Sequence, residues 1–199
     1  TLGNAMTVAS TTSAGTFAFI GDHNLTLTGD WTYTNTTAGH TITNGMTPGT
    51  KLTLDGDMLL NALTGNVSLS ISGTGDTVFN GDIVTGTAFN VNISYTGNGT
   101  LTVAGSNPTA GNTTLNNAGG TIRVIGAGKL GTGALTVNAG SLLIESVSHS
   151  VTTLAMGNVA GTTATVNVAA GLTLSPTAIS FSGTTTLPSE ITGAGTLDL

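Results

Sequence analysis

Short stretches in which apolar and polar residues alternate recur along the whole chain. Examples are LTL at residues 25–27 and 52–54, LTV at 101–103 and 135–137, and VNV at 166–168. Alternation with a period of two is typical of a β-strand with one buried face, so we expect Leu101 and Val103 to point inward and Thr102 outward. Gly, Asn, Asp or Ser follows within a few residues of each stretch, which predicts tight corners between short strands.

These stretches follow one another at a loose period. One apolar marker for each expected turn is found at Leu25, Leu52, Val78, Leu101, Ile122, Leu142, Leu172 and Leu197. The markers lie about 25 residues apart, which is within the range of solenoid repeats. A turn this short cannot enclose a core alone, so its inward side chains must stack on those of the neighbouring turns.

We therefore expect an all-β fold, a β-solenoid or parallel β-helix of roughly eight coils of about 25 residues each. A β-sandwich is the alternative, because short strands separated by frequent turn signals also suit that architecture. Residues 1–199 are expected to form a single domain, with residues 1–45 as a candidate N-terminal capping region.

Charge and apolar length exclude several classes of partner. The chain carries three Lys and Arg residues, 6% charged residues and a net charge of −6, so no nucleic-acid partner is expected, because phosphates need many cations. The longest apolar runs, 58–60 and 142–144, are too short for a membrane span. Cysteine is absent, which excludes disulfides and thiolate metal sites. The chain begins at Thr1 without a leader pattern, so we expect a processed protein or a fragment.

Residues 98–146 carry the clearest internal motif. The segment TTLNNAGGTIRV at 113–124 is followed, after GKLGTG at 128–133, by ALTVNAGSLLI at 134–144. This stretch resembles the autotransporter-associated β-strand repeat, in which a TTxNxGGTLxV segment precedes a GxLGTGALTVNxGTLxL segment. The resemblance implies a secreted bacterial passenger-type β-helix at the cell surface, in which such repeats form a stalk rather than a catalytic centre.

Acidic residues that lie close together in the sequence are the weak candidates for a metal site or for catalysis. They are Asp55, Asp57, Asp76 and Asp82. Asp55 and Asp57 flank Gly56, and a continuing strand would place both carboxylates on one face, where they could bind Ca²⁺ or act as acid and base. The alternative is a DGD or NGD corner in which Asp accepts hydrogen bonds from turn amides. The sequence favours the corner, so we expect no metal, no cofactor and no catalytic residue.

The histidines show no metal-site spacing. His23, His40 and His149 are dispersed along the chain, and neither an HxH nor an HxxxH pair occurs. We expect all three at the surface.

Aromatic residues gather near the beginning of the chain. They are Phe17, Phe19, Trp31 and Tyr33. Trp31 and Tyr33 alternate on one strand and would share a face, which makes them weak candidates for stacking on a sugar ring. The alternative is a hydrophobic plug that covers the first turn, because the end of a solenoid otherwise exposes its core.

The leading functional expectation is an extracellular structural protein and not an enzyme. A rigid Thr-, Gly- and Asn-rich solenoid would serve as a stalk, a surface layer or a filament, and head-to-tail stacking on itself is the expected partnership. A glycan-binding adhesin that uses Trp31 and Tyr33 on surface glycans is the alternative. A polysaccharide lyase that uses the aspartates is a third class.

Overall fold

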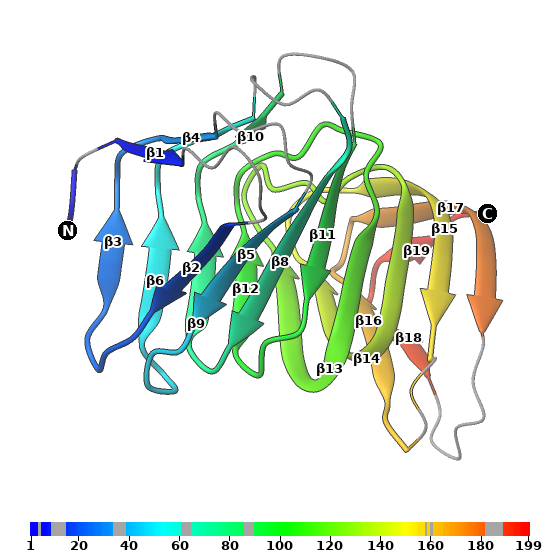
Figure 1. The fold of residues 1–199 in the computed structure, drawn as a ribbon. Helices are drawn as coiled ribbons and strands as arrows, with labels where there is room; N and C mark the ends of the chain where they lie inside the picture. The colour runs from blue at the N-terminus through cyan, green and yellow to red at the C-terminus, as the bar shows by residue number, and fades with distance from the viewer. Residues whose placement is uncertain are drawn as a thin grey trace.

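The computed structural model describes residues 1–3, 5–8, 15–33, 39–60, 65–85, 90–157, 159, 161–181 and 189–199. Every regular element in these ranges is a β-strand, and the strands wind around one axis from end to end (Figure 1). All strand pairs are parallel. Parallel pairing throughout confirms the expected β-solenoid and excludes the sandwich, whose sheets are antiparallel.

Each turn supplies strand residues to three faces, which we call the first, second and third face. The first face contains β2 (Gly15–Phe19), β5 (Gly39–Asn44), β8 (Val67–Gly73), β11 (Val91–Tyr95), the first halves of β13 (Thr113–Val124) and β14 (Ala134–Ile144), and the second halves of β15 (His149–Met156) and β17 (Thr173–Phe181). The second face contains β3 (Leu25–Leu27), β6 (Lys51–Leu54), β9 (Asp76–Phe79), β12 (Thr100–Val103), the second halves of β13 and β14, β16 (Ala164–Val168) and β18 (Glu190–Thr192).

The third face is narrower. It contains β1 (Met6–Val8), β4 (Trp31–Tyr33), β7 (Met58–Leu59), β10 (Ile83–Val84), the first halves of β15 and β17, and β19 (Thr196–Leu197). Between β10 and β15 this face is reduced to a single bridge that pairs Ser106 with Lys129.

The register shows how long the turns are. On the first face Thr41 pairs with Ser70 in the longest turn, which has 29 residues, and Thr136 pairs with Ala155 in the shortest, which has 19. Each of the first two faces stacks eight strands in the described ranges, so about seven turns separate the first strand of a face from the last. The loose period read from the sequence is an average over these unequal turns.

Aliphatic side chains form continuous columns inside the solenoid. One column on the second face runs through Leu25, Leu52, Thr77, Leu101, Ile122, Leu142, Val166 and Ile191. Leu101 and Val103 are 0% and 4% exposed, which confirms their inward orientation. Thr102 has the outward register position but is only 9% exposed, because Val78 and Arg123 flank it in the outward column.

Three of the sequence markers prove to lie elsewhere. Val78 is an outward residue, and its neighbour Thr77 takes the place in the inward column. Leu197 belongs to the third face and Leu172 directly precedes β17, whereas Val166 and Ile191 continue the column above Leu142. In the segment DTVF the residue Thr77 faces inward and Val78 outward, which the apolar pattern does not indicate, because Thr fits either side of a pleat.

Amide side chains join one turn to the next where the chain enters the first face. Asn92 accepts a hydrogen bond on Oδ1 from the amide of Asn112 at 2.8 Å, and Asn112 accepts one from the amide of Ala134 at 2.8 Å. These bonds satisfy backbone amides at the beginning of the first-face strands. Corners and columns together hold successive turns in one register.

Candidate functional site: corner carboxylates and the two end turns

Three aspartates form a ladder at the corner between the second and third faces. Asp30 Oδ1 accepts the amide of Asp57 at 3.0 Å, Asp57 Oδ1 accepts the amide of Asp82 at 2.8 Å, and Asp82 Oδ1 accepts the amide of Ser106 at 2.7 Å. Each carboxylate therefore bonds the turn that follows it, about 25 residues along the chain. The corner interpretation fits this geometry, although the bonds cross between turns instead of staying within one.

The other two candidate aspartates also bind neighbouring turns. Asp55 Oδ1 accepts the Nδ2 amide of Asn80 at 2.6 Å, and Asp76 Oδ1 accepts the backbone amide of Thr100 at 2.8 Å. Asp76 opens the second face, whereas Asp55 lies where that face ends, so the structure does not bring the four carboxylates together. Among the described residues, no group of three or more His, Asp or Glu side chains is placed to hold a metal ion.

The carboxylate ladder predicts a graded response at Asp57. Asp57→Ala removes the acceptor for the Asp82 amide and is expected to lower the free energy of unfolding by about 1 kcal/mol. Asp57→Asn keeps an acceptor oxygen and should stay much closer to the native protein. Urea unfolding followed by circular dichroism measures both, with Asp22→Ala, which lies outside the ladder, as the control. Equal losses for the Ala and Asn variants would show that the inter-turn bond contributes nothing.

Trp31 and Tyr33 lie inside the first turns. Trp31 is 1% exposed and its ring lies 5.5 Å from that of Phe17 and 6.1 Å from that of Phe19, centroid to centroid. Tyr33 is fully buried against His40, with ring centroids 4.2 Å apart, and burial raises the pKa of its hydroxyl. Both rings are therefore buried in the first turns, and neither offers a face on which a sugar could stack.

Two histidines are interior residues, which corrects the expectation that all three lie at the surface. His40 is 2% and His149 4% exposed, whereas His23 is exposed beside Asp22. Burial lowers the pKa of both interior rings. His40 has no hydrogen-bond partner on either ring nitrogen among the described residues, although it occupies the inward position taken by Leu69 one turn later. The alternation around His40 is the signal that could have placed it inside.

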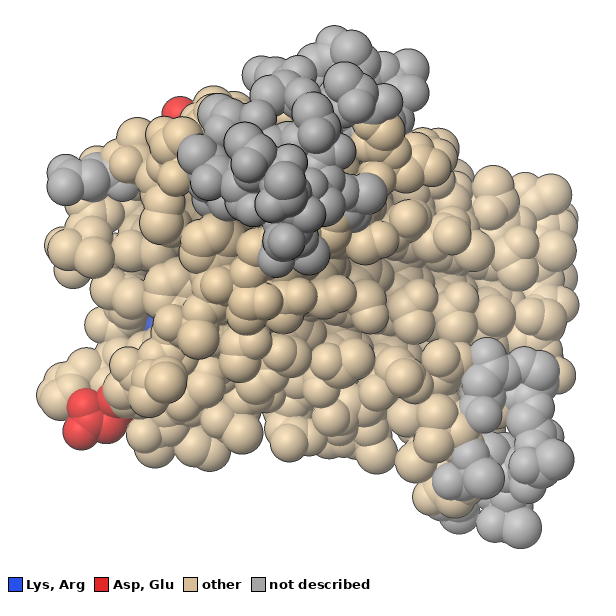
Figure 2. All heavy atoms as spheres, in the orientation of Figure 1, with Lys and Arg blue, Asp and Glu red and all other residues tan. Residues whose placement is uncertain are grey.

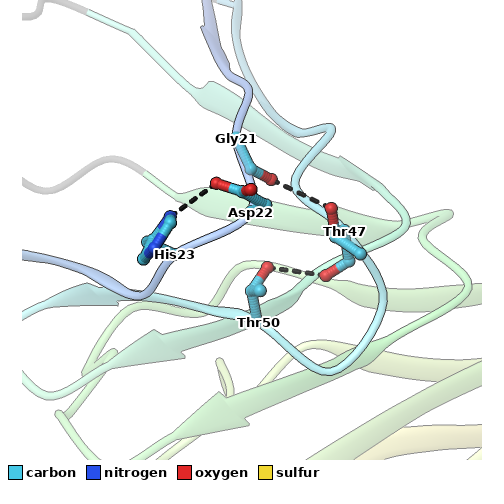
Figure 3. A network of polar contacts seen from close by, with 5 residues as sticks. All are labelled: Gly21, Asp22, His23, Thr47 and Thr50. Carbon is cyan, nitrogen blue, oxygen red and sulfur yellow. Dashed lines mark hydrogen bonds and ion pairs between the residues drawn. The ribbon is translucent and has the colours of Figure 1, made fainter.

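A polar network ties the corner of the first turn to the second. Asp22 and the His23 Nδ1 are 2.5 Å apart, the Thr47 hydroxyl donates to the Gly21 carbonyl at 3.3 Å, and the Thr50 hydroxyl donates to the Thr47 carbonyl at 2.6 Å (Figure 3). Most of the surface seen in Figure 2 carries no charged side chain.

The end turns, residues 1–27 and 172–199, expose apolar side chains that the middle turns cover. The apolar residues that pack on the core while staying partly exposed are Met6, Phe17, Phe19, Leu25, Leu172, Ile179, Ile191 and Leu197. All of these belong to the two end turns. Of the exposed large apolar residues, Leu2 at 58%, Ile20 at 86%, Phe181 at 63% and Leu199 at 83% exposure also lie in these turns, whereas Val159 at 36% does not. At the N-terminal end a hollow of about 390 Å³ opens between Leu2, Met6, Phe19, Leu25 and Trp31.

Strand edges are also open at these ends. In the described ranges β1 pairs with β4 alone and β2 with β5 alone, and at the other end β18 pairs with β16 alone and β19 with β17 alone. The second half of β17 pairs on one side, with β15. Each end therefore combines apolar side chains with backbone groups that have no ladder partner.

The comparisons with known proteins add no relative. The chain matches no family model, no curated protein and no solved structure. In the described part of the chain, no helix has the length and apolar character that crossing a membrane requires.

Proposed function

We infer that this protein is a structural element, a rigid β-solenoid that is extended by end-to-end stacking of further solenoid turns. The observation that carries this proposal is the position of the partly exposed apolar residues that pack against the core, all of which lie in the two end turns. The middle turns gain their cover from their neighbours, so an end turn gains the same cover when another turn is placed on it.

The direction of stacking follows from the parallel strands. A turn that continues the ladder must run the same way as the turn it covers, so the C-terminal end of one molecule fits the N-terminal end of the next. Such a contact joins two different surfaces and does not close on itself. The product is a filament or a lengthened stalk, and a second copy of this chain is the partner to which the proposal commits.

An extracellular setting at a bacterial surface fits this role. The likeness of residues 98–146 to the autotransporter-associated repeat supports a stalk, as does a weakly charged chain without cysteine. A glycan-binding adhesin would have to bind sugars at a surface that does not include Trp31 and Tyr33, because both side chains lie in the core.

Two end variants test the proposal through complementation. Phe181→Asp places a charge on the C-terminal end, and Leu2→Asp places one on the N-terminal end; both side chains are largely exposed, so the fold should persist. We expect the native chain to form single-width fibres in electron microscopy, and each variant alone to sediment as a monomer. An equimolar mixture keeps one intact pair of ends and should give dimers and nothing longer.

Ser68→Asp, on the outward side of the first face between Gly39 and Asn92 in the middle turns, is the control and should leave the fibres intact. A native chain that stays monomeric at the highest soluble concentration would overturn the proposal, as would variants that still polymerise alone.

A further inference from the structure

His149 replaces a backbone acceptor in the ladder of the third face. Elsewhere on this face an amide bonds the carbonyl of the next turn, as from Ile83 to Ser106 at 2.9 Å and from Asn107 to Lys129 at 3.1 Å. The amide of Leu130 instead donates to Nε2 of His149 at 3.0 Å. The His149 ring thus joins these two turns on the third face, next to the stretch where that face is reduced to an isolated bridge. We call this contact between Leu130 and His149 the seam.

The two contacts of the ring fix its protonation state. Nδ1 lies 3.2 Å from the carbonyl of Val147, and because a carbonyl only accepts, Nδ1 carries the hydrogen. Nε2 faces an amide, which only donates, so Nε2 must be bare. A proton on Nε2 would turn the acceptor into a second donor and bring two N–H groups face to face.

The surroundings favour the neutral ring. Burial lowers the pKa of His149, the hydrogen bond to the Val147 carbonyl raises it, and the nearby ammonium of Lys129 lowers it further. The packed strands β14 and β17 and the segment at Ser106 carry no ionisable side chain, and Glu145 is engaged with Arg123 at 2.8 Å. Lys129 is therefore the charged neighbour that faces the ring within the described residues.

We propose that His149 makes this seam acid-sensitive, so that a proton on Nε2 releases the Leu130 amide and opens the third face between these two turns. The first and second faces of the same turns are held by backbone ladders through β14, so the opening stays local. A hollow of about 300 Å³, lined by Asn107, Lys129, Ser148 and His149 among others, gives water access to the ring.

The direction of the pH effect follows from the depressed pKa. The unfolded or opened ring binds a proton at higher pH than the closed ring does. The seam is therefore fully stable above the ordinary histidine range and weakens as the pH falls through it. His40 adds a separate acid sensitivity, but its ring closes no bond between turns.

Amide exchange measured by NMR on the whole chain tests the seam. We expect the protection of the Leu130 amide to fall about tenfold between about pH 7.5 and about pH 5, after correction for intrinsic exchange. The Asn107 amide, which bonds a backbone carbonyl on the same face, is the internal control and should keep its protection. In His149→Gln, which can accept but cannot titrate, the pH dependence at Leu130 should disappear.

A second measurement needs no variant. The nitrogen-15 spectrum of the His149 ring should show a hydrogen on Nδ1 and none on Nε2 at neutral pH, with titration below the ordinary histidine range. Leu130 protection that is independent of pH would overturn the proposal. An equal fall at Leu130 and Asn107, or a hydrogen on Nε2 at neutral pH, would do the same.

Discussion

Val124→Asp is expected to destabilise the protein severely. Val124 is fully buried between Val103 and Ile144 in an inward column of the second face. A carboxylate at that place would have no partner and no water, so the loss should reach about 4–5 kcal/mol. Small domains have a total stability of about 5–15 kcal/mol, and a loss of this size removes about a third of it or more. Circular dichroism and urea unfolding measure the change.

The matched control is Thr136→Asp. Thr136 lies on the outward side of β14, so the same charge meets solvent and should change the free energy of unfolding by less than about 1 kcal/mol. Similar losses for the two variants would show that the assignment of inward and outward sides is wrong.

Gly81→Ala should also destabilise the protein strongly, because the corner at Gly81 has no room for a Cβ. A Cβ at Gly81 would lie 2.1 Å from the carbonyl oxygen of Gly56 on the preceding turn, and a Cβ at Gly105 on the following turn would lie 1.9 Å from the carbonyl oxygen of Gly81. These are backbone atoms, so relief requires the turns to move apart at the corner. We expect a loss of about 3 kcal/mol in urea unfolding.

Gly65→Ala is the control for this prediction. The space beside Gly65 is open, and the added methyl group should leave stability unchanged or raise it by about 0.5 kcal/mol through the unfolded chain. A tolerated Gly81→Ala would mean that the corners are not packed as closely as the stacked turns require.

The fold was predictable because its main signal is local. Alternation in LTV at 101–103 and IRV at 122–124 needs no knowledge of distant residues, and it identified strands whose inward side chains are buried. The loose spacing of such stretches is in turn compatible with few β-sheet architectures. A local pattern is not sufficient at Val78, which the sequence marks as an inward residue. Thr77 and Val78 are both acceptable on an inward face, and only the neighbouring turns decide which of them points inward.

The sites were less predictable because their partners are a full turn away. The ladder from Asp57 to the amide of Asp82 depends on how many residues the turn between them has, and turn length varies along this chain. His149 is recognisable only when Leu130 is known to lie beside it. For Trp31 the sequence left two interpretations open, and burial of the ring against Phe17 leaves no free face for a sugar.

Disulfide formation between neighbouring turns tests the stacked register most directly, since the chain has no cysteine of its own. Thr114 and Thr136 are register partners on the outward side of the first face, about 4.8 Å apart at the strand spacing. Thr114→Cys with Thr136→Cys should therefore oxidise readily to an intramolecular disulfide. Ser94→Cys with Thr136→Cys spans two turns, beyond the reach of about 7 Å, and should stay reduced. Oxidation of the second pair but not the first would contradict the stacking of turns on which the whole account depends.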